Sequence, residues 1–131
     1  EGVVRFMGWV DFASLPMVLA ACDIGLLPML DTLANRAKCS VRFMDFMVAG
    51  LPVIATPVGE TTTYVTDGST GYLAENASPG AVAKAALRAL ADPERTAVAR
   101  RASGHARAAL TWSSLVEPLI DVYARVAMST A

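Results

Sequence analysis

Cysteine and histidine are scarce in this sequence, and their scarcity limits the kinds of site it can build. Its 131 residues include two cysteines and one histidine. Cys22 and Cys39 lack the spacing of zinc ligands and are too few for a disulfide framework. We expect Cys22, at the end of an apolar helix, to be a core thiol. The sequence therefore predicts no metal site and favours a reducing, cytoplasmic setting.

Several short catalytic motifs are also absent. No serine lies in a G-x-S-x-G context, and no Ser-His-Asp set is recognisable. Neither G-x-G-x-x-G nor a P-loop follows a predicted strand. The sequence therefore gives no support to a serine hydrolase or to the common dinucleotide and P-loop binding sites.

The chain has no excess of charge of either sign. Its net charge is -1 at pH 7, so nothing indicates a general attraction to nucleic acid. The arginines between Arg95 and Arg107 could form a basic patch for an anionic membrane. Interspersed alanines and the nearby Asp92 and Glu94 favour an ordinary amphipathic helix instead. The sequence leaves open whether a longer parent protein makes peripheral contact with the cytoplasmic face of a membrane.

Long hydrophobic runs are missing, although the chain is apolar overall. The longest run, residues 46–58, is interrupted by Gly50, Pro52 and Pro57 and is too short to span a bilayer. Even so, 54% of the residues are hydrophobic and the mean hydropathy is +0.44. Parallel strands that are buried on both faces require a high share of hydrophobic residues. A surface that is covered by other parts of a longer protein requires it as well.

The beginning of the chain supports the second of these explanations. The first residue is Glu1 rather than methionine, and a predicted strand follows at once. We therefore expect residues 1–131 to be one N-terminally truncated domain, with an α/β part over 1–78 and a helical tail over 79–131. Uncovered apolar surface and a small net charge also predict a homo-oligomer of this fragment.

Alternating strands and helices predict a Rossmann-like parallel sheet flanked by helices, followed by helices only. The apolar runs and turn residues predict strands at Val3–Met7, Asp23–Leu27, Val53–Thr56 and Thr70–Ala74. Cap residues and helical periodicity predict helices at Ser14–Cys22, Ser40–Ala49, Glu60–Thr66 and Pro79–Ala91, then two more across 92–110 and from Thr111 or Ser113 onward.

Residues 38–60, KCSVRFMDFMVAGLPVIATPVGE, carry the strongest functional signal. A helix begins at Cys39, Ser40 and Val41, where unpaired backbone N–H groups and the positive end of the helix dipole favour a phosphate. Lys38 and Arg42 add positive charge there, and Asp45 stands one turn further on, where it could accept hydrogen bonds from a pair of hydroxyl groups.

A phosphate followed by a diol is typical of a nucleotide sugar, which such sheets bind outside the carboxyl ends of their strands. Gly8, Trp9 and Val10 follow a predicted strand end, and their backbone groups could contact a nucleobase. Plainer interpretations remain for each feature: an ordinary helix cap at Ser40, an exposed Asp45 paired with Arg42, and a turn at Gly8 with one core tryptophan.

Five segments follow one another along the chain: VVRFMGWV, LAACDIGLLPM, KCSVRFMDFMVAGLPVIATPVGE, VTDGSTGYLA and HARAALTWSSLVEPLIDVY. In this order they resemble the nucleotide-binding domain of the GT-B glycosyltransferases, specifically the family 4 group. The resemblance implies a partial C-terminal GT-B domain that binds a nucleotide diphosphate sugar. It also implies a retaining hexosyltransferase reaction without a bound metal, and an acceptor-binding N-terminal domain that is absent here. The chain alone is therefore expected to be inactive.

The resemblance assigns roles to the candidate residues. Asp45 stands where the family has a glutamate that binds the ribose hydroxyls. Cys39, Ser40 and Val41 match the positions around the diphosphate, and Gly8, Trp9 and Val10 match the loop around the base. Two positions depart from the family pattern, since Ala37 and Thr63 stand where many members have glutamate.

Two other functions remain open. The chain could be a non-catalytic Rossmann-like module for nucleotide binding or protein interaction, which the departures at Ala37 and Thr63 favour. It could also belong to a GT-B-fold sugar-nucleotide epimerase, although the catalytic residues of such an enzyme are not found. The sequence does not identify the base, the sugar or the acceptor.

Overall fold

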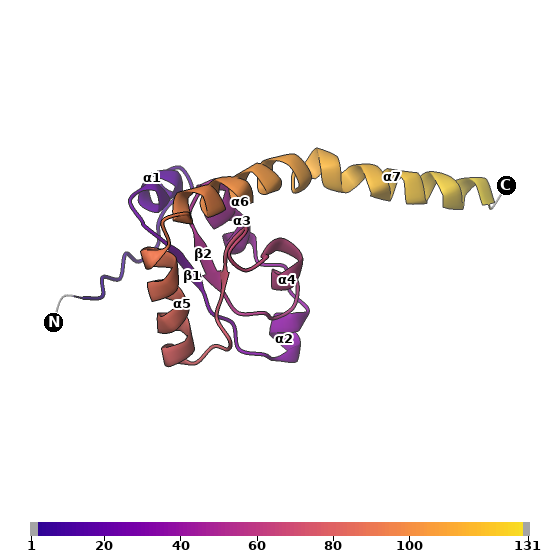
Figure 1. The fold of residues 1–131 in the computed structure, drawn as a ribbon. Coiled ribbons are helices and arrows are strands. Elements are labelled where there is room, and N and C mark those ends of the chain that lie inside the picture. The colour runs from indigo at the N-terminus through magenta and orange to yellow at the C-terminus, as the bar shows by residue number, and fades with distance from the viewer. Residues whose placement is uncertain (1–2, 130–131) are drawn as a thin grey trace.

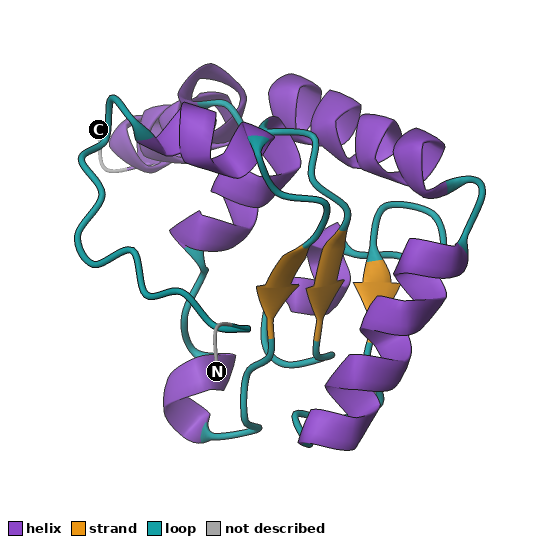
Figure 2. Ribbon diagram, turned by 90° about the vertical axis from the view of Figure 1, so that its left-hand side faces the viewer, coloured by secondary structure: helices purple, strands orange, loops and turns teal. Residues whose placement is uncertain are grey.

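The computed structural model describes residues 3–129 and has the predicted α/β architecture. Three parallel strands form a sheet in the order β1-β2-β3. Figure 2 shows them side by side between helices. The strands are β1 (Gly25–Leu27), β2 (Val53–Ala55) and β3 (Tyr72–Leu73).

The described part of the chain contains seven helices. The first four are short and the last three are longer, and in Figure 1 the final helix extends away from the sheet. The helices are α1 (Leu15–Ala20), α2 (Leu33–Arg36), α3 (Val41–Val48), α4 (Thr61–Tyr64), α5 (Pro79–Ala91), α6 (Arg95–Ala109) and α7 (Trp112–Ser129).

The sheet separates two hydrophobic clusters because alternate residues of a strand point to opposite faces. Val53 and Ala55 of β2 pack with Phe43 and Met47 of α3 and with alanines of α6. Ile54, between them, packs on the other face with Tyr72 and with α5. All three β2 residues are buried, which explains the continuous apolar run in the sequence.

The predicted strand at Val3–Met7 is wrong. This segment has no strand structure, and its side chains are exposed, with Phe6 at 93% of its full accessible surface. A strand forms only when a neighbour accepts and donates its backbone hydrogen bonds. No such neighbour lies within the described residues, so a strongly apolar sequence stays unpaired.

Smaller differences concern the remaining elements. Cys22 is exposed rather than a core thiol, because α1 buries only Leu19. The segment over 29–39, in which no element was predicted, contains the short helix α2, whose first turn is capped by the Thr32 side chain. In contrast, Pro79–Ala91 is confirmed as a helix residue for residue.

The last helix presents a largely uncovered apolar surface. In α7 the side chains of Leu115, Leu119 and Ile120 are each more than half exposed. Figure 1 shows why, since this helix extends beyond the sheet and its flanking helices. Within the described residues, no helix has both the length and the apolar character needed to cross a membrane.

Tyr72 links the sheet to the start of α6 and gives the fold a measurable pH dependence. The Tyr72 hydroxyl donates to Asp92 Oδ2 at 2.7 Å, and the ring is buried. Burial, together with this hydrogen bond, raises the pKa of Tyr72 to about 12. Because the folded pKa exceeds the unfolded value near 10, the protonated phenol stabilises the fold fully below pH 10. That contribution is lost as the pH rises towards 12.

We therefore expect Tyr72→Phe to lower the melting temperature at pH 7 by about 3–6 °C, through loss of one hydrogen bond. The variant should also lose less stability than the wild type between pH 10 and 12. Thermal unfolding followed by circular dichroism at pH 7 and pH 11 measures both effects. An identical alkaline loss in the two proteins would contradict the role of Tyr72.

Candidate functional site

The segments that follow the three strands meet at one edge of the sheet. There they line an open crevice of about 600 Å³. Its walls come from the residues after β1, after β2 and after β3: Met29, Leu30, Asp31, Thr56, Pro57, Val58, Glu75, Asn76, Ala77, Ser78 and Pro79. This is the edge where parallel α/β sheets bind ligands.

The start of α3 lies beside this edge. Lys38 and Ser40 line a small cavity with Met29, which follows β1, and with Glu60 and Thr61, which follow β2. Ser40 is the N-cap of α3 but makes no side-chain cap hydrogen bond, unlike Thr32 at α2 and Ser78 at α5. The first backbone N–H groups of α3 are therefore not capped by their own N-cap side chain.

The charge around this helix start is mixed. Lys38 and Arg42 are exposed and positive, whereas Glu60 is a negative group in the same small cavity as Lys38. Cys39 Sγ lies 3.7 Å from the Tyr64 hydroxyl. This contact, with burial and the nearby Glu60, raises the pKa of Tyr64 to about 12.

Asp45 lies in a different depression from Lys38 and Ser40. It is half-buried and lines a groove of about 490 Å³ between α1, α3 and α6. The other lining residues are mainly apolar: Phe12, Leu15, Pro16, Leu19, Met44, Val48, Ala49 and Arg107. Among the described residues Asp45 does not form the alternative ion pair with Arg42, since the ion pairs join Asp31 with Arg36 and Asp67 with Arg88.

Gly8, Trp9 and Val10 line neither the small cavity of Lys38 and Ser40 nor the groove of Asp45. Gly8 adopts a positive φ of 67°, which only glycine takes up readily, and Trp9 is 96% exposed. The segment then turns at Asp11, whose carboxylate accepts from the Ser14 hydroxyl at 2.7 Å and whose pKa is lowered by that bond. Through Phe12, this part of the chain reaches the groove that contains Asp45.

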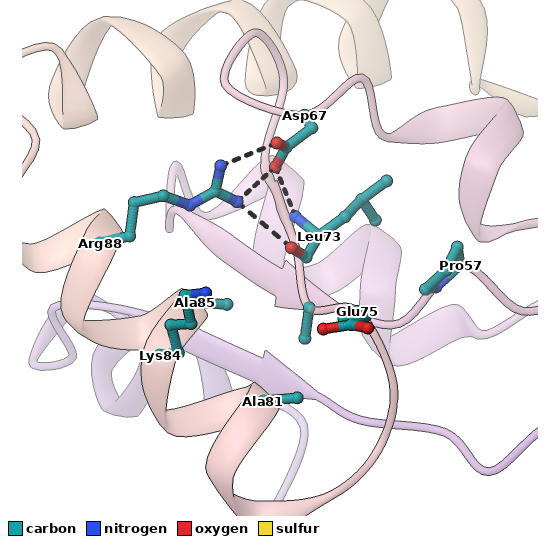
Figure 3. Close-up of a pocket in the computed structure, with 9 residues that line it drawn as sticks. Pro57, Asp67, Leu73, Glu75, Ala81, Lys84, Ala85 and Arg88 are labelled. Atoms are coloured by element: carbon teal, nitrogen blue, oxygen red, sulfur yellow. Dashed lines mark hydrogen bonds and ion pairs between the residues drawn. The ribbon is translucent and has the colours of Figure 1, made fainter.

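A fourth depression, shown in Figure 3, has a structural explanation. It measures about 630 Å³ and lies between β3 and α5. Arg88 donates to both carboxylate oxygens of Asp67, at 2.6 and 2.8 Å, and to the Leu73 carbonyl. The Leu73 N–H in turn donates to Asp67 Oδ1. Arg88 lowers the pKa of Asp67, and the cluster ties α5 to β3.

Two contacts near the start of α3 could not be predicted from the sequence. The hydroxyl of Thr56 bridges to the backbone of Met29, and Gly59 lies against the backbone of Asn35 and Arg36. Both join residues far apart in the chain. The only sequence signal was a polar residue and a glycine directly after a buried strand.

No three histidine, cysteine, aspartate or glutamate side chains within residues 3–129 come together in a way that could hold a metal ion. The expectation of a metal-free site stays a prediction.

Comparison with known proteins places these features in a wider context. The family model described as glycosyl transferases group 1 matches residues 1–92. A D-inositol 3-phosphate glycosyltransferase of Salinispora tropica is 32% identical over 121 residues, which are 92% of this chain and 24% of the relative. A second such enzyme, from Catenulispora acidiphila, is 33% identical over 124 residues, 94% of this chain and 28% of the relative. The chain thus spans about a quarter of the length of these curated relatives.

Solved structures share the fold at lower identity. Sucrose-phosphate synthase from Thermosynechococcus elongatus superposes with a TM-score of 0.79 at 24% identity, covering 95% of this chain and 30% of the other. Anabaena HepE, in complex with UDP and glucose, gives a TM-score of 0.78 at 21% identity and covers 95% and 33%. The three-stranded parallel sheet with its flanking helices is therefore shared with larger proteins.

Proposed function

Because the chain belongs to the glycosyl transferases group 1 family, we propose that it is the donor-binding part of a retaining glycosyltransferase. The longer protein would transfer a hexosyl group from a nucleotide diphosphate sugar to an acceptor. The acceptor would be bound by a part of that protein outside this chain. The reaction would need no metal, because the site offers other positive groups to the departing nucleotide diphosphate.

The observation that carries this proposal is the start of α3 at the carboxyl edge of the sheet. Its first N–H groups are not capped by Ser40, and Lys38 and Arg42 are exposed beside it. N–H groups and the helix dipole stabilise phosphate oxygens, and the two cations add to that field. The same groups would stabilise the negative charge that develops on the diphosphate as the glycosidic bond breaks.

The separate position of Asp45 fits a ligand that lies along the helix. Val41 and Asp45 are four residues apart and so share one face of α3. One helical turn rises about 5.4 Å, a suitable separation for a diphosphate at the helix start and a ribose beside Asp45. The apolar walls of the Asp45 groove offer a surface for the flat nucleoside.

One observation favours the non-catalytic alternative. Glu60 places a carboxylate in the same small cavity as Lys38 and Ser40, where it would oppose a bound phosphate. Together with Ala37 and Thr63, this would suit a module whose donor site has degenerated. Binding measurements separate the two functions.

The proposed function is tested by titrating the chain with UDP, GDP and ADP in a calorimeter. We expect one of the three to bind, and UDP is the first choice because HepE was solved with UDP. The matching nucleoside without phosphates is the control, and it should bind more weakly because it cannot use the start of α3. The absence of binding by all three diphosphates would overturn the proposal.

A further inference from the structure

We propose that Thr56 and Gly59 are positioning residues. They determine where α3 begins and therefore where the diphosphate binds. This inference rests on the proposed function for the identity of the ligand. Neither residue needs to touch the ligand. Each instead holds the connection between β1 and α3, residues 28–40, against the end of β2.

Thr56 holds the beginning of that connection. It is buried, and its hydroxyl donates to the Met29 carbonyl at 2.8 Å while accepting from the Met29 N–H at 2.8 Å. Met29 is also buried, so both of its backbone groups depend on this one side chain. The hydroxyl thus fixes the direction in which the chain leaves the sheet. Because its one O–H donor is already used, the hydroxyl has no hydrogen to donate to a substrate.

Gly59 holds the far end of the connection. A Cβ atom at this position would lie 2.8 Å from the Arg36 carbonyl oxygen and 2.9 Å from that of Asn35. These are backbone atoms, which cannot move aside as the end of a flexible side chain can. The glycine also has a φ of 57°, in the left-handed region. The end of α2 therefore rests directly on the turn after β2.

The residues between these two points are held together by their own hydrogen bonds. The Asn35 N–H donates to Thr32 Oγ1, and the Asn35 side chain donates to the Leu30 carbonyl at 2.7 Å. Arg36 and Asp31 form an ion pair. Residues 30–36 are therefore expected to move as one unit. Four residues after Arg36 the chain reaches Ser40, the N-cap of α3, so a shift of this unit moves the start of the helix.

Gly59→Ala tests the inference, with Gly68→Ala as its matched control. Gly68 has a φ of 71°, but a Cβ there would meet nothing within 4 Å. Both variants carry the strain of a positive φ, whereas only Gly59→Ala pushes against residues 35 and 36. We expect Gly59→Ala to weaken UDP binding by about tenfold or more, since small misplacements at a binding site have large effects. Gly68→Ala should bind UDP like the wild type.

Thr56→Val and Thr56→Ser provide a second test if Gly59→Ala does not fold. Valine keeps the shape but removes the hydroxyl, and serine restores it. Thr56→Val should speed hydrogen exchange at the Met29 amide and at residues 30–40, and lower affinity for UDP while leaving affinity for uridine unchanged. Thr56→Ser should restore both properties.

The two proposals fail in different ways. If the wild type binds UDP and both Gly59→Ala and Thr56→Val bind it equally well, the positioning role is wrong and the proposed function stands. If the wild type binds none of UDP, GDP and ADP, the donor assignment fails, and hydrogen exchange still decides whether Thr56 and Gly59 hold residues 28–40. Unchanged exchange in both variants would then overturn the positioning role as well.

Discussion

Asp45→Ala is expected to weaken the binding of UDP by about tenfold to a hundredfold, which corresponds to losing hydrogen bonds to a charged group. Asp45 is half-buried at the wall of an apolar groove, one turn from the start of α3. A ribose in this groove would direct its two hydroxyl groups at the carboxylate. Alanine would leave those hydroxyls without a charged acceptor. Calorimetry with the wild type and the variant gives the two dissociation constants.

The matched control for this prediction is Asp121→Ala. Asp121 is an exposed aspartate in α7, so its replacement also removes one negative charge without touching the groove. UDP should bind this variant as it binds the wild type. Equal weakening in both variants would indicate a general charge effect, and an unchanged dissociation constant for Asp45→Ala would show that Asp45 does not contact the nucleotide.

The chain is also expected to form dimers or larger species at micromolar concentration. Its exposed apolar side chains include Val4 and Phe6, near the N-terminus, and Leu115 and Leu119, in α7. Contiguous exposed apolar surface favours association, and a net charge of -1 offers little repulsion. Size exclusion coupled to light scattering over a concentration series measures the mass.

Two double variants would locate the contact. Val4→Lys with Phe6→Lys adds charge to the N-terminal segment, and Leu115→Lys with Leu119→Lys adds charge to α7. The exposed positions should tolerate lysine with little change in melting temperature. The pair that restores the monomer identifies the surface. A wild-type chain that stays monomeric throughout the series would refute the prediction.

The parts of the fold that could be predicted are those determined by nearby residues. Ser78 and Pro79 mark the beginning of α5, and the Ser78 side chain accepts from the Ala81 N–H as a cap should. Gly50, with a φ of 75°, ends the segment of α3. The prediction at Val3–Met7 was wrong for the opposite reason. Its sequence favours a strand, but strand formation depends on a partner that the described residues do not contain.

The candidate site divides in the same way. The start of α3 and its flanking charges were visible in the sequence, because a helix start is a local feature. The bridge from Thr56 to Met29 spans 27 positions, and no periodicity or motif reveals such a pairing. The Asp45 groove was equally hidden, since its walls come from three helices that the fold brings together. The assignment of these residues to a nucleotide sugar remains a prediction.

The strand order has a consequence for how the chain folds. Each strand lies beside the one that precedes it in the sequence, and helices and loops between them make each crossover. Contacts therefore join segments that are relatively close along the chain, which lowers the contact order for a parallel sheet. The entropic cost of loop closure is divided into two smaller steps, the first when β2 pairs with β1 and the second when β3 pairs with β2. Such a sheet can grow from its N-terminal strand onward, in the direction in which a ribosome releases the chain.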